Sequence, residues 1–158
     1  MSRTNNVIRF LNSKGVAYTV FETKNEKLGA LETAQFLNIE ADQVFKSIVI
    51  SRGKNAKPLL VIIPGSSKVD LKKVATAADI KKVIMPTERE AEELTGLQAG
   101  GISPLALLNK GFEFFLDETA FVFDRIHISG GERGLNIALH PQTLQDLIRA
   151  KIGDFLGE

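Results

Sequence analysis

Residues 44–50 read VFKSIVI, an apolar run with a lysine inside it. Side chains in a β-strand alternate between its two faces, so Lys46 shares a face with Ile48 while Ser47 points the other way. A polar turn follows, and then the apolar run LLVIIP at residues 59–64. Two β-rich runs joined by a short polar turn predict a hairpin. This hairpin places an ammonium group on an apolar strand face.

Helix and strand signals are mixed along the rest of the chain. Helices are expected at residues 4–14, 31–37, 69–79, 87–95 and 143–152. Further strands are expected at residues 16–21, 81–85, 112–117, 121–129 and 135–140. Strands outnumber helices in mixed order, which favours an α/β fold with a mixed, barrel-like sheet and helices packed around it. No linker or repeat divides the chain, so residues 1–158 are expected to form a single domain.

Three of these helices have recognisable start signals. Thr87 and Glu90 match a capping box, in which the two side chains bond each other's backbone N–H groups. Ser67 and Asp70 resemble a second capping box, with Asp in place of the usual Glu or Gln. Pro141 stands where the last helix is expected to begin, a position that tolerates a missing N–H.

Composition excludes several kinds of chemistry. The chain has 158 residues, a net charge of +1 at pH 7 and no cysteine, which excludes disulfides, thiolate metal sites and cysteine nucleophiles. His127 and His140 are too few to indicate a histidine zinc site, so we expect no metal and no cofactor. The near-neutral charge argues against holding duplex nucleic acid mainly by counterion release. No apolar run reaches the ~18 residues of a membrane span, and we expect a cytoplasmic protein without membrane contact.

Lys46 has two interpretations on the strand alone. In the structural one, its stem packs on Ile48 and its ammonium reaches water at the strand end. In the functional one, the lysine stands at the mouth of a pocket and offers three donors to an anionic or hydroxyl-rich ligand. Lysines of the first kind are common, so the strand by itself favours the structural interpretation.

The segment GGISP at residues 100–104 is a candidate ligand contact. A double glycine permits positive φ angles and lets backbone approach a ligand, and its N–H groups are suited to an anion. A plain turn explains the same residues equally well. The segment lacks the GK[ST] ending of a P-loop and the GxGxxG spacing of a dinucleotide site, which argues against nucleotide hydrolysis and NAD binding.

The segment SGGERG at residues 129–134 links two expected strands. It is either a hairpin loop or a ligand contact through the Ser129 hydroxyl, and Arg133 is either a phosphate contact or a solvated charge. His127 shares the strand face of Ser129, but no carboxylate is placed to orient its ring. A catalytic triad is therefore not indicated, and a packed or surface histidine is favoured.

The order of these motifs resembles one family. The chain has an F-K-S strand, then GGISP, and then SGGxRG before a further strand. This order is similar to that of the YbaK/EbsC family of aminoacyl-tRNA editing proteins. The same fold occurs as the editing insertion domain of bacterial prolyl-tRNA synthetases. The resemblance covers nearly the whole chain and is strongest at residues 45–47, 100–105 and 129–135.

The resemblance implies a barrel-like α/β fold whose pocket is lined by these three segments. Lys46 matches the family's essential lysine, expected to hold the 3′-terminal adenosine of the tRNA. Gly100 and Gly101 match the glycine turn that contacts the aminoacyl end, and with Lys46 they are the expected catalytic residues. The expected substrate-binding residues are Leu28, Ser47, Ile102, Ser103, Pro104, Ser129, Gly130, Gly131, Arg133 and Asn136.

The implied activity is trans-acting deacylation of mischarged tRNA, most of all Cys-tRNA(Pro) and also Cys-tRNA(Cys). Lys46 and backbone amides near Gly100 and Gly101 are expected to position and polarise the ester, while water or the substrate's own thiol attacks it. Expected partners are the acceptor end of an aminoacyl-tRNA and prolyl-tRNA synthetase, and the protein is expected to be a monomer. Two alternatives stay open: deacylation of Ala- or Ser-tRNA within the family, or a non-catalytic module that binds an aminoacyl or nucleotide end.

The chain departs from the family pattern near the first strand. Relatives commonly carry Tyr-x-His where this chain has Thr23, Lys24 and Asn25. An aromatic residue often precedes the next glycine, where this chain has Leu28 before Gly29. These positions shape the pocket entrance, so the departures bear on amino-acid preference.

Overall fold

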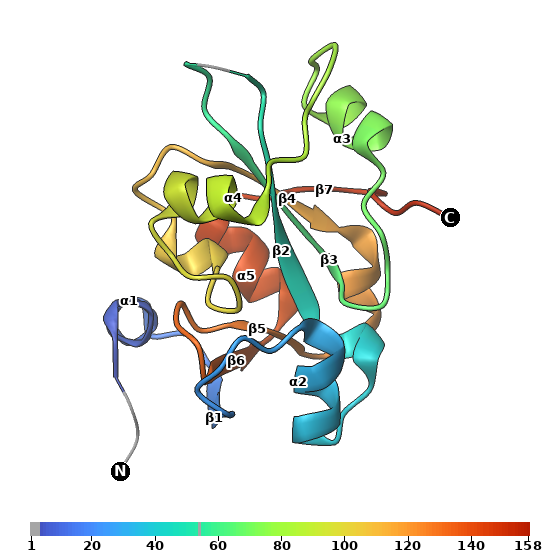
Figure 1. Ribbon diagram of the computed structural model, residues 1–158. Coiled ribbons are helices and arrows are strands. Elements are labelled where there is room, and N and C mark those ends of the chain that lie inside the picture. Colours follow the sequence, from blue (N-terminus) through green and yellow to red (C-terminus); the bar gives the residue numbers. More distant parts are fainter. Residues whose placement is uncertain (1–3, 54) are drawn as a thin grey trace.

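The computed structural model describes residues 4–53 and 55–158, whose strands form two sheets (Figure 1). The antiparallel sheet has the order β1 (Thr19–Glu22), β6 (Leu135–Leu139), β5 (Ile126–Ser129). The mixed sheet has the order β2 (Phe45–Ile50), β3 (Leu59–Pro64), β4 (Glu113–Asp117), β7 (Lys151–Gly153). The α-helices are α1 (Asn6–Lys14), α2 (Ala30–Leu37), α3 (Leu71–Ala77), α4 (Glu88–Thr95) and α5 (Pro141–Ile148). The 3₁₀ helices are η1 (Ala41–Gln43), η2 (Pro104–Ala106) and η3 (Glu118–Val122).

The expected hairpin is confirmed as β2 and β3, which pair Phe45 with Pro64 and Ile50 with Leu59. The β3 strand is buried along its whole length and lies between β2, which is antiparallel to it, and β4, which is parallel. Its alternate side chains supply two apolar clusters on opposite faces of the mixed sheet. Leu60 packs with α1, α5 and the antiparallel sheet, whereas Val61 packs with α3. A run without polar positions is what burial on both faces requires.

The single-domain, mixed α/β architecture agrees with expectation, whereas no closed barrel forms among the described residues. Among the described residues the two sheets share one isolated parallel backbone bridge, between Val44 and His127, and their facing sides pack in one apolar core. The expected strand at residues 121–129 is shortened to Ile126–Ser129, because η3 occupies residues 118–122. The Asp117 side chain caps η3 by accepting a hydrogen bond from the Thr119 N–H at 3.1 Å. A strand of four residues leaves little length for further pairing with β2.

The helix starts follow local hydrogen bonding. Thr87 and Glu90 form the expected capping box of α4, and Pro141 is the first residue of α5. The capping box expected at residues 67–70 is wrong. Asp70 is itself the N-cap of α3, and its carboxylate accepts hydrogen bonds from the backbone N–H groups of Lys72 and Lys73. A short carboxylate at this position bonds the first free N–H groups directly, without a partner three residues earlier.

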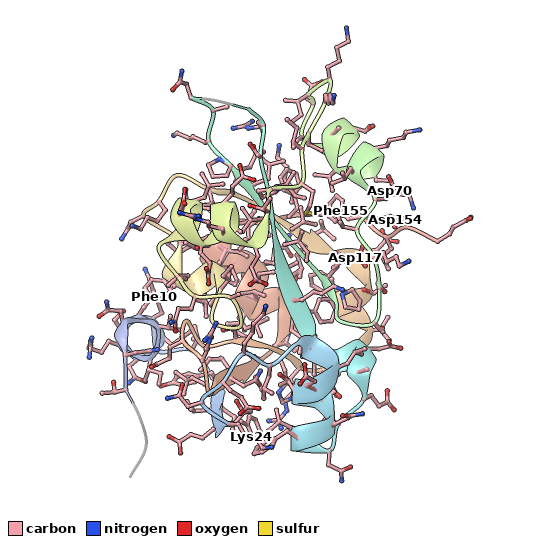
Figure 2. The ribbon with its side chains drawn as sticks, viewed as in Figure 1. Phe10, Lys24, Asp70, Asp117, Asp154 and Phe155 are labelled. Atoms are coloured by element: carbon pink, nitrogen blue, oxygen red, sulfur yellow. The ribbon has the colours of Figure 1, made fainter. Side chains whose placement is uncertain are left out.

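The last expected helix, at residues 143–152, ends early. Arg149 adopts a left-handed conformation with φ of 53°, after which residues 151–153 form β7 beside β4. The segment after β7 is held by Asp117, whose carboxylate accepts a hydrogen bond from the Phe155 N–H at 2.9 Å (Figure 2). The strand expected at residues 81–85 is reduced to one bridge, between Ser51 and Ile84. Tertiary pairing therefore overrides the local periodicity in both places.

Close approach at Gly65 places α2 against the end of the hairpin. A Cβ atom at position 65 would lie 2.2 Å from the Cβ of Ala30, so only glycine admits the first turn of α2 here. The loop before α2 thereby reaches the start of β2. None of the helices in the described ranges combines the length and the apolar character needed to cross a membrane.

Candidate active site

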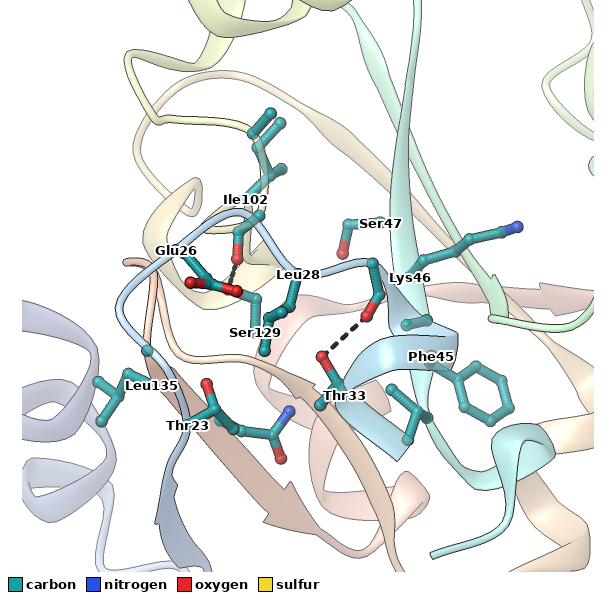
Figure 3. A pocket seen from close by; sticks show the side chains of 17 residues that line it. Thr23, Glu26, Leu28, Thr33, Phe45, Lys46, Ser47, Ile102, Ser129 and Leu135 are labelled. Atoms are coloured by element: carbon teal, nitrogen blue, oxygen red, sulfur yellow. Dashed lines mark hydrogen bonds between the residues drawn. The ribbon is translucent and has the colours of Figure 1, made fainter. Parts of the chain in front are cut away.

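A cavity of about 270 Å³ lies where the edge strand β2 meets the antiparallel sheet and the start of α2 (Figure 3). Its walls come from the loop before α2, from β2, from the turn at residues 99–102 and from β5 and β6. The lining residues are Thr23, Glu26, Leu28, Gly29, Ala30, Thr33, Val44, Phe45, Lys46, Ser47, Ala99, Gly100, Ile102, Ser129, Gly134, Leu135 and Asn136. The segments singled out in the sequence therefore meet at one cavity.

The expected site residues divide into two groups. Those that line the cavity are Leu28, Lys46, Ser47, Gly100, Ile102, Ser129 and Asn136. Those that lie outside its lining are Gly101, Ser103, Pro104, Gly130, Gly131 and Arg133. Pro104 of the second group is the first residue of η2, and the contacts of the other five residues are described below.

Lys46 lies at the cavity without pointing into its centre. Its side chain is partly buried and extends away from Leu28 and Ser129, and the ammonium donates a hydrogen bond to the carbonyl oxygen of Gly65 at 3.2 Å (Figure 3). Burial lowers the pKa of the Lys46 ammonium below its ordinary value, because the charged form loses hydration. The ammonium has three N–H groups, so one bond to Gly65 leaves donors for a ligand at the cavity rim.

One face of the antiparallel sheet turns a polar side toward the cavity. In the strand register Asn136 lies opposite both Phe21 and Ser129, so these three residues cross the sheet in a row. The Ser129 hydroxyl lies 3.5 Å from the carbonyl oxygen of Gly100 and accepts a hydrogen bond from the Gly131 N–H at 3.3 Å. The alternate residues of these strands, such as Ile128, are buried in the apolar core instead.

His127 stands beside this row and is almost fully buried, with 1% of its surface exposed. Its Nδ1 lies 2.9 Å from Oδ1 of Asn136, and its ring packs against Phe21 with centroids 5.3 Å apart. Burial lowers the pKa of His127, and the charge of Arg125 lowers it further, while the bond to Asn136 opposes the shift. The packed histidine expected from the sequence is confirmed, and its ring is oriented by an amide rather than by the carboxylate of a triad.

The glycine turn presents one of its two glycines to the cavity. Gly100 lines the cavity with φ of 88°. The Gly101 N–H, which was expected to polarise the ester together with Gly100, donates to the carbonyl oxygen of Gln98 at 2.8 Å and is therefore engaged within the turn. A Cβ atom at position 101 would lie 2.9 Å from Cα of Glu132, which explains a glycine there by packing. The buried Ser103 caps η2 by accepting a hydrogen bond from the Leu105 N–H.

The loop at residues 129–134 braces the same turn. Arg133 donates through Nε to the carbonyl oxygen of Ala99 at 2.8 Å, so part of its guanidinium is committed to structure. Gly130 donates to the carbonyl oxygen of Leu135 at 2.8 Å, and its own carbonyl oxygen accepts from the Asn5 side chain at 2.9 Å. These bonds link α1, the loop and the turn that carries Gly100.

Glu26 is a cavity residue that the sequence did not indicate. It contributes the single carboxylate among the described lining residues, and Figure 3 shows it near Ser129, on the other side of Leu28 from the Lys46 ammonium. It lies in the irregular segment between β1 and α2, which has no periodicity to assign a face. Its position next to the departures at residues 23–25 was the available signal. Across residues 4–53 and 55–158, no three His, Asp or Glu side chains gather as a metal site.

The chain is similar to known editing proteins. Residues 25–147 match the family model of the aminoacyl-tRNA editing domain. The chain is 33% identical over 151 residues to an Enterococcus faecalis protein provisionally named the Cys-tRNA(Pro)/Cys-tRNA(Cys) deacylase EbsC. This match covers 94% of this chain and 91% of that protein. It is 29% identical over 105 residues to the proline–tRNA ligase of Limosilactobacillus fermentum, covering 63% of this chain and 18% of the ligase.

A solved structure agrees with these sequence matches. A crystal structure described provisionally as a trans-editing enzyme for prolyl tRNA synthetase superposes with a TM-score of 0.80 at 25% identity, covering 99% of this chain and all of the other. The family model alone spans most of the chain, including every residue expected at the site. The chain therefore belongs to the aminoacyl-tRNA editing domain family.

Proposed function

We propose that the protein removes wrongly attached amino acids from tRNA in trans, with Cys-tRNA(Pro) as its principal substrate and Cys-tRNA(Cys) as a second one. The observation that carries this proposal is the meeting of Lys46, Gly100, Ser129 and Asn136 at a single cavity. The similarity to the EbsC relative, at 33% identity, supports the choice of cysteine.

The cavity suits an aminoacyl ester in size and charge. Its volume of about 270 Å³ is enough for the few non-hydrogen atoms of a small amino acid and its ester. The terminal adenosine then lies at the open side, beside Lys46. Glu26 is placed to pair with the α-ammonium of the amino acid, while the free donors of Lys46 bind the terminal ribose or phosphate.

The proposed reaction uses the substrate's own thiol. The cysteine sulfur attacks the carbonyl carbon, a carbon–sulfur bond forms, and the ester carbon–oxygen bond breaks. The thiol proton passes to the departing ribose oxygen, so the products are uncharged tRNA and a cyclic thioester of cysteine. Because the nucleophile comes with the substrate, the protein has to supply position and charge stabilisation, which is what Lys46 and the glycine turn offer.

The two glycines that were expected to polarise the ester carbonyl differ in their hydrogen bonding. The Gly101 N–H is engaged by Gln98, whereas the Gly100 N–H has no hydrogen-bond partner within residues 4–53 and 55–158. Gly100 also lines the cavity. Of the two glycines, Gly100 is therefore the one that we assign to the substrate.

We further propose that prolyl-tRNA synthetase delivers the tRNA to a cytoplasmic, monomeric editing protein. A chain with a net charge of +1 has little attraction for the body of a tRNA. A synthetase that already holds the mischarged tRNA removes the need for this attraction. Adding synthetase and tRNA to the purified protein is expected to increase its apparent size and its activity, and no change in either quantity would contradict the complex.

A panel of charged tRNAs tests the substrate. The purified protein is incubated with Cys-tRNA(Pro), Cys-tRNA(Cys), Ala-tRNA(Pro) and Ser-tRNA, and the remaining aminoacyl-tRNA is measured over time. We expect both cysteinyl-tRNAs to be deacylated fastest. Faster loss of alanine or serine would move the protein to another branch of the family, and binding without loss of any amino acid would indicate a non-catalytic module.

A further inference from the structure

The bond between His127 and Asn136 determines how the Asn136 amide is turned. Asn136 lies on β6 opposite Ser129, and His127 lies two residues before Ser129 on β5, diagonally across the strand pair. Diagonal neighbours on one sheet face are within reach of a side chain such as histidine. The 2.9 Å distance joins Nδ1 of the ring to Oδ1 of the amide.

The direction of this hydrogen bond follows from its two atoms. An amide carbonyl oxygen can only accept, so the ring nitrogen that faces it must carry the proton. His127 is therefore in the Nδ1–H form, and its burial keeps it neutral by disfavouring the charged ring. In this form the bond holds Oδ1 of Asn136 at the ring and directs the amide NH₂ group away from it.

Packing alone does not account for a histidine here. Its Nε2 is buried without a hydrogen-bond partner among the described residues, a loss of hydration that a leucine of similar size would avoid. An apolar side chain would also pack against the Phe21 ring. What an apolar residue cannot supply is the Nδ1–H that orients Asn136.

Asn136 is itself placed to contact the substrate. It is 5% exposed, and the surface that it retains lies at the cavity. With Oδ1 bound to His127, the group left to face the cavity is the NH₂ donor. A fixed donor aimed at a developing negative charge is an effective catalytic device, because it needs no reorganisation during the reaction.

We propose that His127 is a positioning residue that holds the Asn136 amide with its NH₂ group toward the cavity, where it donates a hydrogen bond to the carbonyl oxygen of the aminoacyl ester. This inference rests on the proposed deacylase function. The hydrogen bond strengthens as the carbonyl oxygen becomes an oxyanion. Its loss therefore lowers kcat more than it raises KM.

Three single variants and one double variant separate positioning from packing. His127→Leu removes the donor and keeps an apolar side chain, whereas His127→Asn places an amide N–H near the former Nδ1. We expect His127→Leu and Asn136→Ala each to lower kcat about 10- to 100-fold with little change in KM, and His127→Asn to stay within about 3-fold of the parent. The double variant His127→Leu/Asn136→Ala is expected to lose no more than either single variant, because both remove the same hydrogen bond.

A matched control excludes general loss of structure. Asp117→Asn weakens another buried polar cluster, the one around η3, and is expected to lower the thermal midpoint without changing kcat below that midpoint. If His127→Asn is as inactive as His127→Leu, or if the losses of the two single variants multiply in the double variant, the positioning role is wrong. If His127→Leu does not fold, Asn136→Ala and His127→Asn still decide between the two outcomes.

A spectroscopic measurement separates this inference from the proposed function. In the ¹⁵N NMR spectrum of the free protein, His127 is expected to be protonated at Nδ1 and not at Nε2, whatever substrate the protein uses. Titration with a non-hydrolysable aminoacyl-adenosine analogue is expected to shift the Asn136 NH₂ signals. An inactive protein that shows both signatures would contradict the deacylase and retain the positioning. A ring protonated at Nε2 would overturn the positioning itself.

Discussion

Lys46 and Ala30 meet the same residue, Gly65, from two sides. The Gly65 carbonyl oxygen accepts the hydrogen bond of the Lys46 ammonium at 3.2 Å, and the missing Gly65 side chain admits Ala30 at the start of α2. Both Lys46 and Ala30 line the cavity. Gly65 therefore couples the lysine that we assign to the tRNA end with the helix that closes the other wall.

The partly buried Lys46 ammonium is expected to lower the free energy of unfolding of the protein. The folded protein holds the Lys46 pKa below its ordinary value of 10.5, so the unfolded chain binds the proton more tightly. The penalty is fully present at pH values below the folded pKa, and it disappears as the pH rises toward 10.5. We expect Lys46→Met to have a higher Tm than the parent at pH 7, and the difference to narrow at pH 10. A parent that melts above the variant at pH 7 would contradict this assignment.

Gly65→Ala is expected to displace the start of α2. The new Cβ would overlap the Cβ of Ala30, and overpacking of this kind costs about 1–3 kcal/mol of unfolding free energy. Chemical denaturation measures the change. Ala30→Gly in the same chain removes the clashing atom, so the double variant should recover part of the loss. Equal stability of Gly65→Ala and the double variant would show that the clash is relieved in another way.

Glu26 is expected to recognise the α-ammonium of the amino acid. Glu26→Gln removes the charge and keeps the shape, and an exposed ion pair of this kind is worth about 2- to 5-fold in kcat/KM. An N-acetylated substrate lacks the ammonium, so the variant and the parent should deacylate it at the same rate. Glu22→Gln, on an exposed carboxylate outside the cavity lining, serves as the matched control. The same fractional loss on both substrates would exclude this role for Glu26.

Much of the frame was predictable from short-range patterns. Alternation placed Lys46 and Ser47 on opposite faces of β2, and the spacing of Thr87 and Glu90 located the start of α4. Such signals depend on neighbours in sequence, which periodicity and capping describe directly.

The remaining features depend on contacts between distant segments. Residues 151 and 152 continue a helical pattern, yet residues 151–153 pair with β4 because Arg149 ends α5 and the chain returns to the sheet. Gly101 was expected as a catalytic residue, but the close approach of Glu132, from a loop distant in sequence, accounts for a glycine at this position. Glu26 reaches the cavity from an irregular loop, where no repeating pattern indicates which side chains face inward. These outcomes are set by tertiary packing, which local sequence does not encode.

The thiol mechanism predicts a sharp dependence on the substrate side chain. S-methylation of Cys-tRNA(Pro) removes the attacking thiol while keeping an ester of similar size. We expect the methylated substrate to bind with a similar KM or Kd and to keep its amino acid during incubation. We expect the free-thiol substrate to yield the cyclic thioester, which mass spectrometry detects before it hydrolyses. Equal deacylation of the two substrates would assign the attack to water instead.

Lys46, on an otherwise apolar strand, is proposed to hold the tRNA end for deacylation. This role is tested by comparing the parent, Lys46→Ala and Lys110→Ala in the deacylation of Cys-tRNA(Pro). Lys110 is an exposed lysine outside the cavity lining, so its variant controls for general charge. We expect a loss of about 10- to 100-fold in kcat/KM for Lys46→Ala, the effect of removing a charged hydrogen-bond donor, and no loss for Lys110→Ala. Equal deacylation by the parent and by Lys46→Ala would show that Lys46 does not hold the tRNA end.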